Sequence, residues 1–208
     1  MYANHQPIIS EWARRSSDNM ARVLQMTVIS ARQKFFNVPA LMEQAESNDP
    51  SGALYGWKVR AYNEFWSMRH EIHWQCQDIM QTPETAEDNL VAYLASLHGL
   101  GFAKAGFAVQ MLYGLSGCLD SVNIQRLGID PYITRSRAGE RPVKLGTYRD
   151  RVAKYNHVCH LFGGSAKLWD DWCEAIARRY PSQFKDANAV SAYHLACFGM
   201  WEYYDNAK

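Results

Sequence analysis

Apolar residues recur along this chain with the spacing of helices. From Met20 to Ala31, and again over residues 59–80, hydrophobic side chains return every three or four positions, as they do on one face of an α-helix. No segment alternates apolar and polar residues for long enough to form a strand. The pattern predicts an all-α fold.

Local signals place the expected helices. Asp18 precedes the first, Pro39 opens a short second one, and Thr82 can cap a later helix that has Pro83 in its first turn and ends at Gly99. The helices are expected at about 19–31, 39–46, 59–80, 83–99, 102–113, 147–162, 165–180 and 188–203, with one more starting after Asp120.

Size and composition predict one compact domain spanning residues 1–208. The chain is 48% hydrophobic, and no run approaches the roughly 18 consecutive apolar residues of a membrane span. Its start lacks the features of a secretory signal, so an intracellular location and no membrane partner are expected. The five cysteines are dispersed and form no C-x-x-C pair, which predicts reduced thiols rather than disulfides or a zinc ribbon. We expect a monomer.

Charge is distributed unevenly although the net charge is only +1. Residues 132–154 hold seven basic and two acidic residues, a local charge of +5. Such a segment can contact phosphates, although a solvated loop and helix face would look the same. The candidate phosphate contacts in its loop are Arg135, Arg137, Arg141 and Lys144.

A Gly-Leu-Gly turn joins two expected helices at residues 97–107, sequence LHGLGFAKAGF. The missing side chains of Gly99 and Gly101 permit positive φ and let a phosphate approach the peptide N–H groups, while Leu100 can anchor the turn in the core. The following helix points its free amides at that phosphate, and Lys104 can add a cation. Alone, a Gly-x-Gly turn is also compatible with a simple helix end.

Asp120 stands alone at the start of the next expected helix, in the sequence LDSVNIQRLG over residues 119–128. An aspartate there commonly caps the helix. A carboxylate held at a helix N-terminus can also stay ionised and stabilise positive charge that develops on a sugar. Capping and catalysis are compatible.

Together, Leu97-x-Gly99-Leu100-Gly101 with Ala105, and Leu119-Asp120 with Asn123 and Arg126, resemble the helix-hairpin-helix superfamily of DNA glycosylases, which contains endonuclease III and the mismatch adenine glycosylases. The resemblance implies a two-lobed helical bundle, with the hairpin at about residues 84–113 and the catalytic aspartate segment at 119–128. It also implies double-stranded DNA with a flipped target base as partner, Asp120 as catalytic carboxylate, and DNA contacts from His98, Gly99, Leu100, Gly101, Ala103, Lys104 and Asn123.

The chain departs from the family pattern at three places. His98 replaces a frequent proline, and Asn123 with Arg126 lies one residue further from Asp120 than the family spacing. Ala103 occupies the place of the Schiff-base lysine of bifunctional members, with Lys104 about 100° further around the helix. The resemblance therefore implies a monofunctional enzyme without lyase activity. The dispersed cysteines predict no iron–sulfur cluster, and no cofactor is expected.

Three functions remain open from the sequence. The first is hydrolysis of the N-glycosidic bond of an extruded base. The second is modification of a base, because the resemblance extends more loosely to virus-encoded proteins of glycosylase-like fold that are proposed to act on hypermodified pyrimidines. The third is DNA binding without catalysis.

Other constellations carry weaker signals. Trp66, Trp74 and Tyr113 could stack on an extruded base, but aromatic residues at helical spacing more often belong to a core. His70 with His73, and His157 with Cys159 and His160, lack the spacing of known zinc sites, so no metal site is expected.

Overall fold

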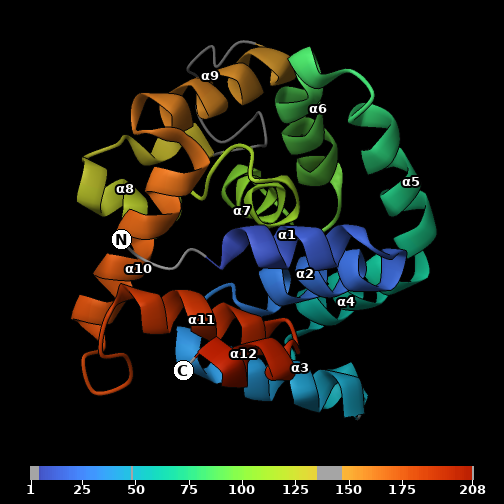
Figure 1. Ribbon diagram of the computed structural model, residues 1–208. Helices are drawn as coiled ribbons and strands as arrows, with labels where there is room; N and C mark the ends of the chain where they lie inside the picture. The colour runs from blue at the N-terminus through green and yellow to red at the C-terminus, as the bar shows by residue number, and fades with distance from the viewer. Residues whose placement is uncertain (1–4, 48, 135–146, 208) are drawn as a thin grey trace.

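The computed structural model describes residues 5–47, 49–134 and 147–207, and these residues form an all-α fold without strands (Figure 1). Three short 3₁₀ turns lie at Phe35–Asn37, Pro50–Gly52 and Pro131–Thr134. The α-helices are α1 Gln6–Arg14, α2 Ser17–Ile29, α3 Val38–Ser47, α4 Gly56–Ser67, α5 Arg69–Ile79, α6 Pro83–Ser96, α7 Phe102–Tyr113, α8 Ser121–Leu127, α9 Tyr148–Leu161, α10 Gly164–Arg179, α11 Ala187–Cys197 and α12 Trp201–Ala207.

Helix α7 lies at the centre of the molecule, with α1, α2 and α6 packed against it (Figure 1). Nearly every side chain from Ala105 to Leu112 is buried, because this helix is apolar on all faces rather than on one stripe. It ends at Gly114, which adopts the left-handed conformation (φ +69°) that favours glycine.

The C-terminal helices form a second group beside this centre. Helix α9 packs against both α6 and α10, and α10 also contacts α8 and α11. Helix α11 in turn contacts α3 and α12, so residues from both ends of the chain lie side by side there. One continuous hydrophobic core runs through both groups of helices.

Several expected helices have the predicted position. Helix α7 spans 102–113 as expected, and α6 begins at Pro83. The Thr82 side chain makes no capping hydrogen bond, however, and α6 ends at Ser96, three residues before Gly99. Helix α9 begins with a capping box in which Thr147 and Asp150 satisfy each other's backbone N–H groups.

Two helices that the pattern predicted as continuous are broken. The segment expected at 59–80 divides into α4 and α5 at Met68, and the segment at 188–203 divides into α11 and α12 around Gly199 (φ +75°). Two further starts differ. Helix α1 was not predicted, and α2 is capped by Ser16, whose side chain accepts from the Asn19 N–H, while Asp18 lies within the first turn.

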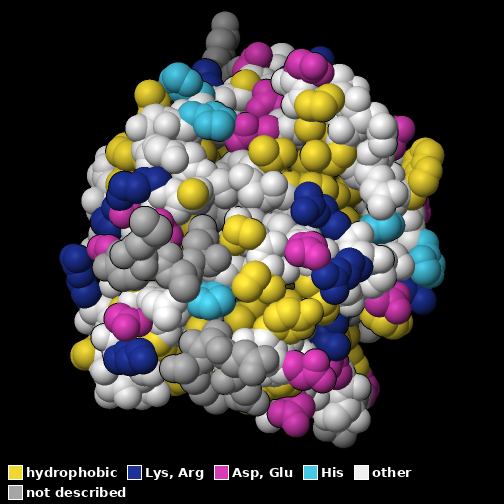
Figure 2. Space-filling model, in the orientation of Figure 1, with side chains coloured by type: hydrophobic (Ala, Val, Ile, Leu, Met, Phe, Trp, Pro, Cys, Tyr) yellow, Lys and Arg dark blue, Asp and Glu magenta, His cyan; other side chains and the backbone are white. Residues whose placement is uncertain are grey.

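On the face drawn in Figure 2, basic and acidic side chains are both present and are interspersed with hydrophobic groups that reach the surface. Within the described part of the chain, no helix is both long and apolar enough to cross a membrane.

Candidate functional site

A cavity of about 560 Å³ lies where the end of α2 and the start of α7 face α8, α10 and α11. Its volume is within the range of small-molecule sites. Asp120 and Lys104, both singled out by sequence, line this cavity together. The lining also includes Arg32, Lys34, Phe35, Phe107, Gln110, Cys118, Trp169, Trp172, Arg179, Tyr180 and His194.

Asp120 uses its two carboxylate oxygens differently. Oδ1 accepts the backbone N–H groups of Val122 and Asn123, both at 3.0 Å, and so caps α8 as expected. Oδ2 accepts the indole Nε1–H of Trp172 at 2.9 Å. Each oxygen can accept more than one hydrogen bond, so Oδ2 keeps capacity for a ligand or a water in the cavity.

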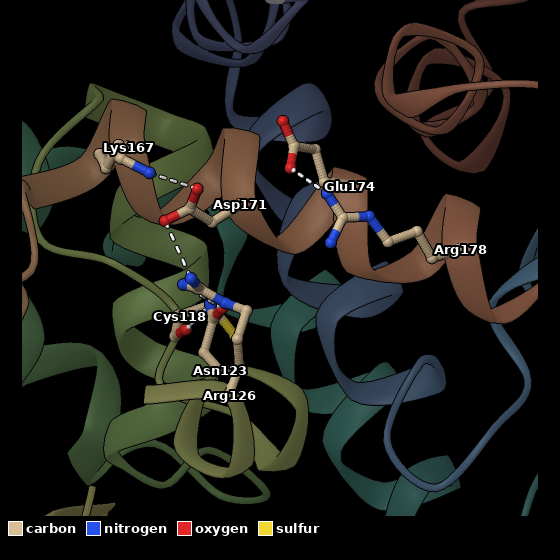
Figure 3. Close-up of polar contacts among 7 residues, drawn as sticks. All are labelled: Cys118, Asn123, Arg126, Lys167, Asp171, Glu174 and Arg178. Carbon is tan, nitrogen blue, oxygen red and sulfur yellow. Dashed lines mark hydrogen bonds and ion pairs between the residues drawn. The ribbon is translucent and has the colours of Figure 1, made fainter. Parts of the chain in front are cut away.

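Helix α8 is held in place by a polar network that reaches α10 (Figure 3). Asn123 is fully buried, donates through Nδ2 to the Cys118 carbonyl at 2.7 Å, and accepts from Arg126 at 3.3 Å. Arg126 forms an ion pair at 3.0 Å with Asp171, which also pairs with Lys167. In this structure Asn123 therefore holds the segment that carries Asp120, and the expected contact of Asn123 with DNA stays a prediction.

Lys104 is a partly buried cation on the first turn of α7. Its Nζ donates to the Ser30 Oγ at 2.8 Å, and Ser30 in turn donates to the Thr27 carbonyl. Burial lowers the pKa of Lys104, while the charge of Asp120 acts in the opposite direction. The Lys104 side chain reaches the cavity that holds Asp120.

Aromatic rings from three segments form the walls of the cavity. Trp169 and Trp172 stack with centroids 6.1 Å apart, and Phe35 meets Trp172 edge-on at 5.4 Å. His194 packs against Trp169 and Phe35, both at 4.4 Å. The sequence alone did not predict the contact between Phe35 and Trp172, because these two residues are more than 130 positions apart in the chain.

His194 is neutral in this environment. Its Nδ1 lies 3.0 Å from the Val190 carbonyl, which can only accept, so Nδ1 carries the proton and Nε2 is left as an acceptor. Burial lowers the pKa of His194 to about 3. Nearby, Gln110 donates through Nε2 to the Ser165 carbonyl at 2.7 Å, and its buried Oε1 has no partner among the described residues.

The turn between α6 and α7 has the predicted anchor but only one left-handed glycine. Gly99 has φ +84°, whereas Gly101 is extended (φ −108°), so the expectation of positive φ does not apply there. Leu100 is buried as expected. A Cβ on Gly99 would lie 2.9 Å from the Ala61 Cβ, so the absence of a side chain at Gly99 allows the turn to pack closely against α4.

The other described residues singled out in the sequence do not line the cavity. His98 and Ala103 are both partly buried, and the His98 Nε2 has no partner in the described part of the chain. Trp66 and Trp74 are exposed on α4 and α5, and neither they nor Tyr113 line the cavity. Within the described residues no three His, Cys, Asp or Glu side chains are grouped to hold a metal ion. Arg135, Arg137, Arg141 and Lys144 lie outside the described residues.

Sequence reasoning missed most side chains of the cavity, among them Arg32, Lys34, Trp172 and Arg179. A weak signal existed for the first two, which lie in a polar stretch directly after α2. For Trp172 and Arg179 there was none, because helical periodicity does not show which neighbour a face meets. Comparisons with protein-family models, curated proteins and solved structures found no match to this chain.

Proposed function

We propose that the protein is a DNA glycosylase-like enzyme that holds an extruded base in the cavity and hydrolyses its N-glycosidic bond with Asp120. The observation that carries this proposal is the environment of one carboxylate. Asp120 is fixed by α8 through Oδ1 and by Trp172 through Oδ2, inside a cavity with aromatic walls.

The chemistry follows from that arrangement. A base removed from the stack needs an apolar, aromatic environment, which Phe35, Trp169 and Trp172 provide. As the glycosidic bond breaks, positive charge develops on the sugar, and a carboxylate already oriented by hydrogen bonds stabilises it without reorganising. The same carboxylate can orient or deprotonate the attacking water.

The turn between α6 and α7 would act as the grip on DNA. Gly101 supplies no capping side chain to the first amides of α7, so a phosphate can accept from them. Contacts of this kind position the duplex and leave the choice of base to the cavity. In this proposal α6 and α7 are the helical hairpin, and the two groups of helices are the two lobes of a glycosylase-like fold.

One observation favours a second function. Lys104 lies in the same cavity as Asp120, so a base placed there would meet a cation as well as a carboxylate. This pair also suits substitution on the base with the glycosidic bond left intact. The two reactions differ in product, an abasic site or an altered nucleoside.

The test incubates the protein with duplexes that carry uracil, 5-hydroxymethyluracil, alkylated or oxidised bases. Products are scored by alkali cleavage and by mass spectrometry of the nucleosides. Asp120→Asn keeps an Oδ1 acceptor for the cap but places an amide N–H against the Trp172 N–H, and Asp120→Ser keeps a cap without a carboxylate. A parallel sample with borohydride traps any Schiff base on Lys104.

Alkali-labile product from the wild type, reduced about 10²- to 10⁴-fold in both variants, supports hydrolysis by Asp120. Both variants should remain folded, with losses of about 1–3 kcal/mol from the missing hydrogen bond to a charged group. Intact strands with a mass-shifted base would replace hydrolysis by base modification. A trapped adduct would contradict monofunctional action, and binding without any product would leave only a DNA-binding module.

A further inference from the structure

Four basic side chains line the cavity: Arg32, Lys34, Lys104 and Arg179, here called the basic set. Among the described residues that line the cavity, Asp120 is the only acidic one. Within the described residues, no member of the basic set forms an ion pair with a carboxylate. The cavity therefore carries an excess of positive charge in a chain whose net charge is only +1.

The contrast with neighbouring cations makes this excess specific to the cavity. Arg178 precedes Arg179 on α10, yet its guanidinium pairs with Glu174 at 3.2 Å (Figure 3). Lys167, on the same helix, pairs with Asp171. Of the basic residues on α10, the one that faces the cavity is the one without a carboxylate partner in the described structure.

A further cation lies beneath the segment that carries Arg32 and Lys34. Lys58 is buried, and its Nζ donates to the carbonyls of Ile29 and Ala31 at 2.8 and 2.6 Å. Burial, followed by the charges of Lys104 and Arg32, lowers the pKa of Lys58 to about 8. Each of these positive charges makes it less favourable for the others to be protonated. A bound anion would stabilise the charged form of all of them.

The backbone of this segment is held in an uncommon conformation. Arg32 has φ +58°, a left-handed geometry that is rare for a residue with a side chain. Lys58 fixes the carbonyls on either side of Ser30, and Ser30 accepts from Lys104. The turn that presents Arg32 and Lys34 is thus tied to the two lysines by hydrogen bonds.

Aromatic side chains lie beside these cations. Phe35 follows Lys34 directly, and Tyr180 follows Arg179 directly, and both line the cavity. A nucleotide has an anionic phosphoryl group and a flat base, which match these cations and aromatic rings. We propose that the basic set binds the phosphoryl group of a nucleotide whose base lies between the aromatic walls of the cavity.

This inference rests on the proposed function only for the source of the nucleotide. A phosphodiester beside an extruded nucleotide in DNA and the 5′-phosphate of a free nucleotide offer the same phosphoryl oxygens to arginine and lysine. Binding of free nucleotides can be measured without any reaction on DNA. Failure of the phosphate subsite and failure of the glycosylase proposal are therefore separate results.

The experiment measures binding by calorimetry for the four 2′-deoxynucleoside 5′-monophosphates, the matching nucleosides and inorganic phosphate. The test variant is the double change Arg32→Gln with Lys34→Gln, and the matched control is Arg178→Gln, a basic residue of α10 that does not line the cavity. Both variants change exposed side chains, so thermal unfolding should show them folded. A duplex with one neutral methylphosphonate beside the target nucleotide identifies the DNA source.

We expect at least one monophosphate to bind about tenfold or more tightly than its nucleoside, with inorganic phosphate competing. The double variant should lose that advantage, while Arg178→Gln keeps it. Equal affinity for nucleotide and nucleoside, no binding of any phosphate probe, or an equal loss in the Arg178→Gln control would overturn the subsite. Loss of affinity on the methylphosphonate duplex assigns the phosphate to DNA, and unchanged affinity assigns it to a free nucleotide.

Discussion

Replacing Gly99 with alanine should destabilise the protein through two separable effects at the turn between α6 and α7. The first is the left-handed φ of +84°, which costs a residue with a Cβ about 1–2 kcal/mol. The second is overlap, because the new Cβ would lie 2.9 Å from the Ala61 Cβ on α4, and overpacking of this kind costs about 1–3 kcal/mol. Together they predict a loss of about 2–5 kcal/mol.

Gly128 provides the matched control for the backbone effect. It also has a left-handed φ, +64°, but a Cβ there would meet nothing within 4 Å. Gly128→Ala should therefore cost only the backbone part, about 1–2 kcal/mol. The difference between the two variants is the cost of overlap with Ala61.

A double-mutant cycle tests the cause directly. Ala61→Gly removes the opposing methyl group, so the pair Ala61→Gly with Gly99→Ala should recover about 1–3 kcal/mol relative to the sum of the single changes. Urea unfolding followed by circular dichroism gives the free energies. Additivity within about 0.5 kcal/mol, or equal losses in Gly99→Ala and Gly128→Ala, would refute the reasoning.

Three further predictions concern the surroundings of the cavity. Asn123→Ala leaves the Cys118 carbonyl without its hydrogen-bond donor and should lower the free energy of unfolding by about 1–3 kcal/mol, measured in urea. The control Gln125→Ala, at an exposed neighbouring position, should change it by less than about 0.5 kcal/mol. Similar losses in the two variants would contradict the role given to Asn123. Burial lowers the pKa of His194 to about 3 in the folded protein, so as the pH falls the unfolded chain binds a proton at this histidine before the folded chain does. Stability should therefore fall as the pH drops from about 6.5 toward 3. His194→Gln should flatten this dependence in thermal melts, and an unchanged slope would exclude His194 as its source. All five cysteines are free and buried, so a thiol reagent should label them only after denaturation; rapid labelling of the native protein would contradict their burial.

The helices of the centre were predictable because their signals are local. Pro83 fits only the first turn of a helix, and the left-handed glycines Gly99 and Gly114 lie on either side of α7. The break at Met68 was not predictable in the same way. It has neither glycine nor proline, and the apolar period continues across it, although α4 and α5 form two separate helices that each pack against α2.

The same limit explains which part of the site the sequence predicted. The capping role of Asp120 was predictable because capping depends on residues immediately after it, and its two N–H partners are two and three positions away. Its catalytic role came from the family resemblance and stays a prediction. Its other partner, Trp172, is 52 residues away and is positioned only when α10 packs against α8.

Charge follows the same division between local and long-range information. The sequence located a basic stretch at residues 132–154 because its members are neighbours in the chain. The basic set of the cavity comes from three separate segments, and each of its members is unremarkable within its own segment. A net charge of +1 therefore carries little information about ligands, because an anion responds to the potential inside a cavity where few opposing carboxylates lie. Binding that weakens with added salt, and that depends on Arg32 and Lys34 but not on Arg178, would be the signature of such a local potential.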